Sequence, residues 1–188
     1  MPMPMEGYRV LDMTTWYQSV AGRMLGDLGA EVIKIEPRVT GDPMRGVIEI
    51  QKMETGEARR NVAFEHGNYN KKSITLDLRK EKGREILYKL VEKSDVFLHN
   101  LRREPASRLG LDYDTLSQYN PRLVYTVSSG WGSKGPDINR ASYDRLAQAR
   151  SGIMSLAGQP ETPPSYINAA IADHMGATVT TLAWLSLS

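Results

Sequence analysis

The chain contains no cysteine, which excludes disulfides, cysteine nucleophiles and cysteine-ligated metal sites. It also has no apolar run long enough to span a bilayer, and residues 1–6 lack the basic and apolar regions of a signal peptide. The formal net charge of its 188 residues is only +2, so no general affinity for nucleic acid or membrane follows. We therefore expect a cytoplasmic protein that acts on small molecules, with no nucleic acid or membrane partner.

Two nucleotide-binding motifs are absent as well. No G-x-G-x-x-G follows the first predicted strand and no G-x-x-x-x-G-K-[ST] occurs anywhere, so neither a nicotinamide dinucleotide site nor a P-loop is supported. The three histidines, His66, His99 and His174, lack metal-ligand spacing, and we expect no metal site. His174 adjoins Asp173, but adjacent residues of a helix point in different directions, which weakens the case for a catalytic pair.

Short strands alternate with helices along the chain. Strands are predicted at residues 8–13, 31–36, 73–78, 95–100 and 123–128, and helices at 19–28, 80–93, 103–109, 113–118, 143–157 and 172–187. The segment 37–70, rich in Gly, Arg and Glu, is predicted to be a long loop. This alternation predicts an α/β fold with a Rossmann-like, mainly parallel sheet and flanking helices.

An acidic residue stands where the last predicted helix begins. Asp173 follows small and apolar residues and precedes a long apolar run, so its carboxylate lies at the start of a mostly buried helix. The free N–H groups and the dipole of a helix N-terminus stabilise an anion there. Position alone favours an N-cap, which is a common use of Asp. The alternative is a carboxylate nucleophile, which forms a covalent intermediate.

Basic residues cluster near the ends of the predicted strands. They are Arg38 after the second strand, Lys71 and Lys72 before the third, and Arg102, Arg103 and Arg108 after the fourth. Such side chains hold phosphates through charge-assisted hydrogen bonds, although spacing alone favours solvated surface charge. The glycine-rich segment 128–136 leaves a similar choice between a ligand-contacting loop and an ordinary cluster of turns.

Taken together and in order, these segments resemble the class III CoA-transferases, typified by formyl-CoA and crotonobetaine CoA-transferases. The most recognisable segment is residues 25–36, which read Leu-Gly-Asp-Leu-Gly-Ala-Glu-Val-Ile-Lys-Ile-Glu. The other matching segments are 7–12, 41–43, 70–78, 95–100, 108–111, 129–132, 143–144, 148–149 and 151–152. Each motif alone is weak, but the ordered set covers nearly the whole chain and aligns Asp173 with the catalytic aspartate of the family.

The resemblance implies transfer of CoA between an acyl-CoA thioester and a free carboxylic acid. The Asp173 carboxylate would attack the thioester, giving a mixed anhydride and CoA thiolate. The thiolate would then attack the aspartyl carbonyl, releasing the donor acid and leaving an aspartyl-CoA thioester. The acceptor acid repeats these steps in reverse. CoA is then a substrate, and no tightly bound cofactor is expected.

The resemblance also implies binding roles for particular residues. The residues expected to contact CoA are Arg38, Lys71, Lys72, Asn100 and Arg108. The residues expected to border the acyl pocket are Trp16, Tyr17, Gln18, Gly130, Trp131 and Tyr143. Cations around the CoA phosphates supply binding energy remote from the thioester, and that energy orients the reacting carbonyl.

One difference between this chain and the family pattern distinguishes the transferases from the racemases. The relative α-methylacyl-CoA racemase uses a histidine just before an aspartate, where this chain reads Tyr143-Asp144. Two-base proton exchange at an α-carbon is hard to run without that histidine. The sequence therefore favours a transferase over a racemase-like isomerase.

Length is the second departure. Family members are longer, so the resemblance equates residues 1–188 with the N-terminal part of the large CoA-binding, Rossmann-like domain, without the small domain and the returning C-terminal segment. The chain also ends inside an apolar helix with no closing residue. We expect a homodimer or a subunit completed by another chain, and a non-catalytic CoA-binding or partner subunit remains the alternative.

Overall fold

The structure is a computed structural model that describes residues 2–46 and 61–186. Its five strands form a single, entirely parallel sheet in the order β3-β2-β1-β4-β5. The strands are β1 (Arg9–Met13), β2 (Glu31–Pro37), β3 (Lys72–Leu76), β4 (Val96–His99) and β5 (Val124–Val127). The predicted α/β, Rossmann-like fold is confirmed. Residues 47–60 of the predicted loop, and residues 187–188 at the end of the last predicted helix, lie outside the described residues.

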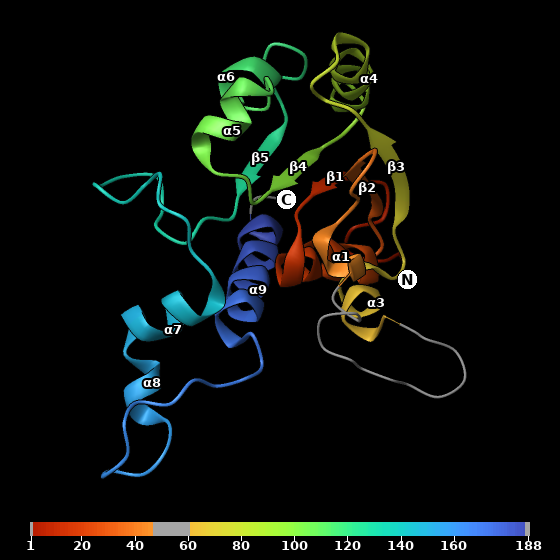
Figure 1. Cartoon of the computed structure of the whole chain (residues 1–188). Coiled ribbons are helices and arrows are strands. Elements are labelled where there is room, and N and C mark those ends of the chain that lie inside the picture. The colour runs from red at the N-terminus through yellow and green to blue at the C-terminus, as the bar shows by residue number, and fades with distance from the viewer. Residues whose placement is uncertain (1, 47–60, 187–188) are drawn as a thin grey trace.

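Helices and 3-10 turns connect the strands and continue beyond β5 (Figure 1). They are η1 (Trp16–Ser19), α1 (Val20–Asp27), η2 (Pro43–Gly46), α3 (Val62–Asn68), α4 (Glu81–Val91), α5 (Arg103–Arg108), α6 (Tyr113–Leu116), α7 (Asp144–Ser151), α8 (Ile153–Leu156) and α9 (Ile171–Leu185).

Two predictions about these elements are wrong. The predicted loop 37–70 contains η2 and α3, and the predicted helix 143–157 is divided into α7 and α8. The division falls at Gly152, whose φ of 80° is left-handed and ends α7 in the way that glycine favours at a helix C-terminus.

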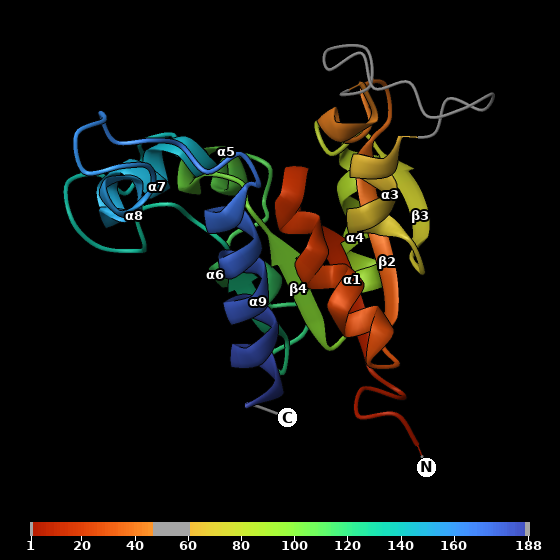
Figure 2. The same ribbon diagram turned by 90° about the horizontal axis from the view of Figure 1, so that it is seen from below.

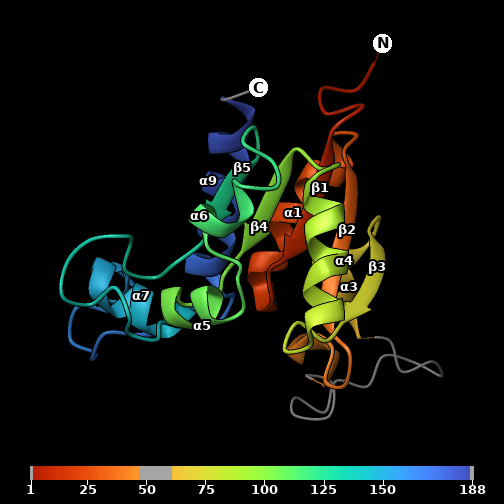
Figure 3. The same cartoon turned by 90° about the horizontal axis from the view of Figure 1, so that it is seen from above.

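Helices cover both faces of the sheet. Alternate residues of a strand face opposite ways, and in β1 Val10 packs in the apolar cluster that includes Leu25 and Trp184, whereas Leu11 packs in the cluster that includes Leu87. Accordingly, α1 and α9 lie on the first face, seen from below in Figure 2. Helices α4, α5 and α6 lie on the second face, seen from above in Figure 3. This is a three-layer, doubly wound arrangement.

The last helix is tied to the first. In α9, Ala177, Thr181 and Trp184 are buried, and the Thr181 hydroxyl lies 3.4 Å from the carbonyl oxygen of Ala21 in α1. Helices α7 and α8 stand to one side of the sheet (Figure 1). None of the helices in the described part of the chain has the length and apolar character needed to cross a membrane.

Candidate active site

The sheet order places a switch point between β1 and β4, where the chain turns to build the sheet in the other direction. In open α/β sheets, ligands bind in the crevice beyond the carboxyl ends of the strands at such a point. Here Asn100, which follows β4, holds the loop that follows β1. Its Oδ1 accepts from the Thr15 N–H at 3.0 Å, and its Nδ2 donates to the Thr15 carbonyl at 3.0 Å. Asn100, which the sequence predicted as a site residue, therefore lies at the crevice. Its side-chain amide is hydrogen-bonded to the loop that follows β1.

A buried ion pair lies beneath one end of this loop. The Lys71 ammonium is 2.6 Å from Asp12 Oδ2 and donates to the Ser19 carbonyl at 2.7 Å. Gly22 of α1 leaves room for the carboxylate, since a Cβ there would come within 2.3 Å of Asp12 Oδ2. Burial alone raises the pKa of Asp12, but the ammonium groups of Lys71 and Lys34 outweigh burial and hold the pKa below its ordinary value. Asp12 is therefore a buried carboxylate that depends on its lysine partners.

A second buried ion pair holds the other end of the loop. Lys34 Nζ lies 2.8 Å from Asp42 Oδ2 and donates to the Thr14 carbonyl at 2.9 Å. Both side chains are almost completely buried. The two lysines thus support both the β1–η1 loop and η1, and η1 carries three of the predicted pocket residues.

The predicted CoA contacts of Lys71 and Lys72 do not agree with this arrangement. The side chain of Lys71 is only 2% exposed and its ammonium is fully engaged. Lys72 pairs with Glu31 at the first residue of β2, toward the amino ends of the strands and away from the crevice. We therefore build the candidate site without these two lysines, and their contacts with CoA stay predictions.

Asp173 is the third residue of α9 and does not cap it. The N-cap is Ala170, a non-glycine residue held at the left-handed φ of 45° and ψ of 44°. The first-turn N–H groups of α9 donate instead to Asp144 in α7, whose Oδ1 lies 2.8 Å from the Ala172 nitrogen and 3.2 Å from the Asp173 nitrogen. The N-cap interpretation of Asp173 is therefore wrong, and its half-buried carboxylate is free of that structural role.

The Asp173 carboxyl has an unusual affinity for protons. Burial, and then the neighbouring Asp144 carboxylate, raise the pKa of Asp173 from 3.8 to about 6, and His174 opposes them weakly. An acid with this pKa is ionised at neutral pH yet is more basic than an ordinary carboxylate. Such shifted groups are candidates for functional sites when geometry supports them.

Aromatic rings lie against His174, the neighbour of Asp173 in α9. The His174 ring lies between the rings of Tyr17 in η1 and His66 in α3, with centroid distances of 5.2 and 5.6 Å. His174 Nδ1 lies 2.9 Å from the Ala170 carbonyl oxygen, which only accepts, so Nδ1 carries the proton and fixes the ring. Burial, Arg23 and His174 together lower the pKa of His66. These contacts bring the predicted Tyr17 to the start of α9.

Gln18 also faces α9. The residue is only 6% exposed, and within the described residues its Nε2 has no hydrogen-bond partner. The amide lies close to Gly176 of α9, where a Cβ would be in ordinary van der Waals contact, 3.5 Å from Gln18 Oε1. Trp16 begins the same 3-10 turn at a left-handed φ of 59° and is 37% exposed. Trp16 at the start of η1 and Ala170 just before α9 are thus both non-glycine residues with a left-handed backbone, and strain of this kind clusters at functional sites.

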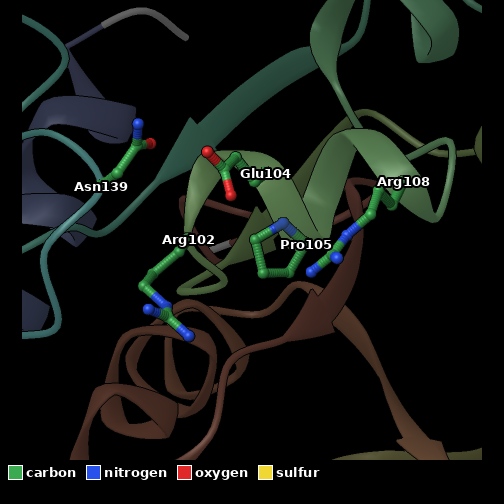
Figure 4. Close-up of a pocket in the computed structure, with 5 residues that line it drawn as sticks. All are labelled: Arg102, Glu104, Pro105, Arg108 and Asn139. Carbon is green, nitrogen blue, oxygen red and sulfur yellow. The ribbon is translucent and has the colours of Figure 1, made fainter.

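A small pocket carrying two arginines lies after β4. It is lined by Arg102, Glu104, Pro105, Arg108 and Asn139. In Figure 4 the guanidinium groups of Arg102 and Arg108 lie on either side of Pro105, while Glu104 points away from Arg108. Arg38 is exposed directly after β2, and none of the described residues forms an ion pair with it. The predicted Arg38 and Arg108 are thus both accessible cations.

The loop after β5 is anchored to itself and to α7. Trp131 Nε1 donates to the Ala141 carbonyl at 3.3 Å, and the Arg150 guanidinium lies 4.8 Å from the Trp131 ring centre. A Cβ on Gly130 would come within 2.1 Å of Ser142. Tyr143 is 70% exposed. The described contacts do not bring Gly130, Trp131 or the Tyr143 ring to Asp173, so their pocket role stays a prediction.

The fold and site define a class: a doubly wound α/β protein with a half-buried carboxylate near the switch point of its sheet and accessible arginines in the segments that follow β2 and β4. The chain belongs to CoA-transferase family III, whose family model matches residues 5–187.

Over the aligned residues, known proteins of this kind are 34–39% identical to the chain. It is 35% identical over 172 residues to a succinate–glutarate CoA-transferase of Agrobacterium fabrum, covering 90% of this chain and 43% of that one. It is 39% identical over 165 residues to an acetyl-CoA:oxalate CoA-transferase of Acetobacter aceti, covering 87% and 41%. A CAIB/BAIF family protein from Brucella suis superposes with a TM-score of 0.90 at 34% identity, covering 99% and 49%. The chain thus spans less than half the length of these relatives.

Proposed function

We propose that this chain supplies the CoA-binding sheet and the nucleophile for transfer of CoA between an acyl-CoA thioester and a free carboxylic acid. The observation that carries the proposal is the position of Asp173 in the first turn of α9, which packs against η1 through Tyr17 and His174 close to the switch point. Relatives named as CoA-transferases for succinate, glutarate and oxalate support it, and suggest short carboxylic acids as substrates.

The chemistry follows from one carboxylate. Asp173 attacks the thioester carbonyl, the C–S bond breaks, and CoA leaves as a thiolate beside a mixed anhydride. The thiolate returns to the aspartyl carbonyl and expels the donor acid, so that CoA is now bound to Asp173 as a thioester. An acceptor carboxylate reverses both steps and carries CoA away. In this scheme the unpartnered Gln18 Nε2 is available to donate to the acyl oxygen, and the Arg102–Arg108 pocket is available to bind CoA phosphate.

A second polypeptide is part of the proposal. Large apolar side chains on α9 are well exposed, with Met175 at 59%, Val179 at 63% and Leu182 at 59%. Exposed apolar surface of this kind marks an interface. One relative is named as the alpha subunit of a succinyl-CoA–L-malate CoA-transferase of Chloroflexus aurantiacus, which is 36% identical. We therefore propose a homodimer or a complementing subunit, and keep a cytoplasmic location as a prediction.

Acylation of Asp173 tests the proposed nucleophile. We expect incubation with a panel of acyl-CoA donors to give an adduct that intact-mass spectrometry detects and hydroxylamine traps at Asp173. Because only the ionised carboxylate attacks, and its pKa is about 6, the initial rate should fall as pH drops through 6 rather than through 4. An adduct at another residue, or none despite CoA binding, would contradict the nucleophile role and favour the non-catalytic subunit.

Arg108→Ala tests the proposed phosphate site. Losing one charge-assisted hydrogen bond should weaken CoA binding about tenfold, measured by calorimetry. Added salt should reduce the difference in affinity between the variant and the parent chain, because salt screens the charge of Arg108. Arg79→Ala is the matched control, because Arg79 is an exposed arginine that pairs with Asp77 away from the pocket. Equal affinities of the Arg108 variant, the control and the parent chain would remove Arg108 from the site.

A further inference from the structure

The first turn of α9 is capped by a side chain from another helix, Asp144 of α7. The Asp144 side chain, which lies at the start of α7 and is 8% exposed, accepts from two α9 N–H groups through Oδ1. Its Oδ2 accepts from Gln148 Nε2 at 2.6 Å. Gln148 is fully buried and also exchanges two hydrogen bonds with the backbone of Ile167, in the segment that leads into α9. One buried carboxylate thus orients the turn that bears Asp173.

We infer that Asp144 is a positioning residue for the nucleophile, which both fixes the first turn of α9 and keeps a second negative charge beside the Asp173 carboxylate. The inference rests on the proposed nucleophile role of Asp173. Asp144 forms no bond to substrate in this scheme; it acts only through Asp173.

The charge is as important as the hydrogen bonds. A carboxylate near another carboxylate favours the protonated form of its neighbour and makes the ionised neighbour more basic. The titratable groups facing the start of α9 are Asp144 from α7, His174 from α9 itself, Tyr17 from η1 and His66 from α3. Of these, Asp144 is the one that raises the proton affinity of Asp173.

Substitutions that keep a hydrogen-bond acceptor at position 144 but remove its charge distinguish the electrostatic role of Asp144 from a purely structural one. Asp144→Asn keeps an oxygen for the two N–H groups but removes the charge, although its amide nitrogen then faces the Gln148 amide. Asp144→Ser offers a hydroxyl oxygen without that conflict and serves as the second variant. Asp112→Asn is the matched control, because Asp112 caps α6 by accepting from the Thr115 N–H at 3.0 Å and lies in a different helix.

The measurement is the pH titration of the Asp173 carboxyl carbon by NMR in the intact chain. We expect the Asp173 pKa to fall by about one unit in Asp144→Asn and Asp144→Ser, and to stay unchanged in Asp112→Asn. An unchanged Asp173 pKa in a folded Asp144 variant would overturn the inference. So would unfolding of both variants, since Asp144 would then be a residue of the fold alone.

A second readout separates this inference from the proposed function. The pH dependence of acylation by a reactive acyl-CoA should move with the Asp173 pKa, so its acid limb should shift to lower pH in both Asp144 variants. If the Asp173 pKa falls but the parent chain forms no adduct at any pH, the proposed nucleophile fails while the electrostatic link between the two carboxylates stands. If adducts form and their pH dependence is the same in all variants, the positioning role fails and the nucleophile stands.

Discussion

Replacing Asp173 by asparagine is expected to abolish acylation while making the fold more stable. The amide has nearly the shape of the carboxyl group but cannot form the anhydride, and removal of a covalent nucleophile costs on the order of 10⁶ in rate. No adduct should therefore be detectable by intact mass with any acyl-CoA donor. Binding of CoA itself, measured by calorimetry, should remain, because Asp173 does not line the arginine pocket.

The gain in stability follows from the raised pKa. The folded state binds a proton at Asp173 more tightly than the unfolded state does, so ionisation costs stability as pH rises from 4 to 6, and the full cost persists above 6. A difference between 3.8 and about 6 is equivalent to about 3 kcal/mol for a buried group. Because this carboxyl is only half-buried, solvent screening reduces the expected gain at neutral pH to about 1 kcal/mol.

Asp114→Asn provides the contrast. Asp114 is an exposed acid in the first turn of α6, where the helix dipole favours a negative charge. Its replacement should leave acylation unchanged and cost a few tenths of a kcal/mol in urea unfolding. If Asp173→Asn is instead destabilised at pH 7, or still forms an adduct at the parent rate, Asp173 is an ordinary structural residue. A stabilised, unreactive variant is the signature of a residue kept for function.

Much of this fold follows from local pattern. The alternation of strands and helices predicted the parallel sheet, because segments such as Val96-Phe97-Leu98 in β4 are short and apolar and helices such as α4 have an apolar face. Helix α3 was missed because its start depends on tertiary contacts. Asn61 accepts from the Phe64 N–H as a cap, while its amide donates to the carbonyls of Met44 and Arg45 in η2. Contacts between residues so far apart in the chain leave no trace in the local pattern of apolar residues, from which helices are predicted.

The site was less predictable than the fold. Asp173, Tyr17 and Gln18 were identified through resemblance. The structure packs η1, which carries Tyr17 and Gln18, against His174 and Gly176 of α9, and the roles of the three residues stay predictions. Asp144 was visible only as part of a matching motif, because the N–H groups that donate to it lie 28 and 29 residues further along the chain. The pairing of an acid at the start of α7 with Gln148 one turn later was the only available signal.

The adjacent lysines show why position within a strand matters. Lys71 and Lys72 have the same chemistry and neighbouring numbers, but the side chain of one is 2% exposed and that of the other is 71% exposed. The side chains of consecutive residues in a strand point to opposite faces of the sheet. Only the folded structure reveals that Lys71 is the lysine on the buried side, where it pairs with Asp12. A basic pair in a sequence therefore predicts cations without saying which one is accessible.

This difference leads to the largest expected effect on stability. Lys71→Met should destabilise the chain by about 3–5 kcal/mol, because it leaves the fully buried Asp12 carboxylate without its nearest cation. A loss of that size is a large fraction of the total stability of an ordinary domain. Lys72→Met is the matched control, since it removes an exposed ammonium from a surface pair with Glu31 and should change stability by about 0.5 kcal/mol at most. Urea unfolding of the three chains at pH 7 measures both effects.

A double variant identifies the cause of the loss. Asp12→Asn combined with Lys71→Met removes both charges and keeps the Asn oxygen that accepts from the Thr14 N–H, so it should recover much of the stability lost by Lys71→Met alone. Recovery would show that the unpaired buried carboxylate, rather than the lost packing of the lysine stem, dominates the cost. If Lys71→Met instead folds normally and weakens CoA binding more than Lys72→Met does, the lysine serves the ligand after all. The assignment of Lys71 to the support of the β1–η1 loop would then be wrong.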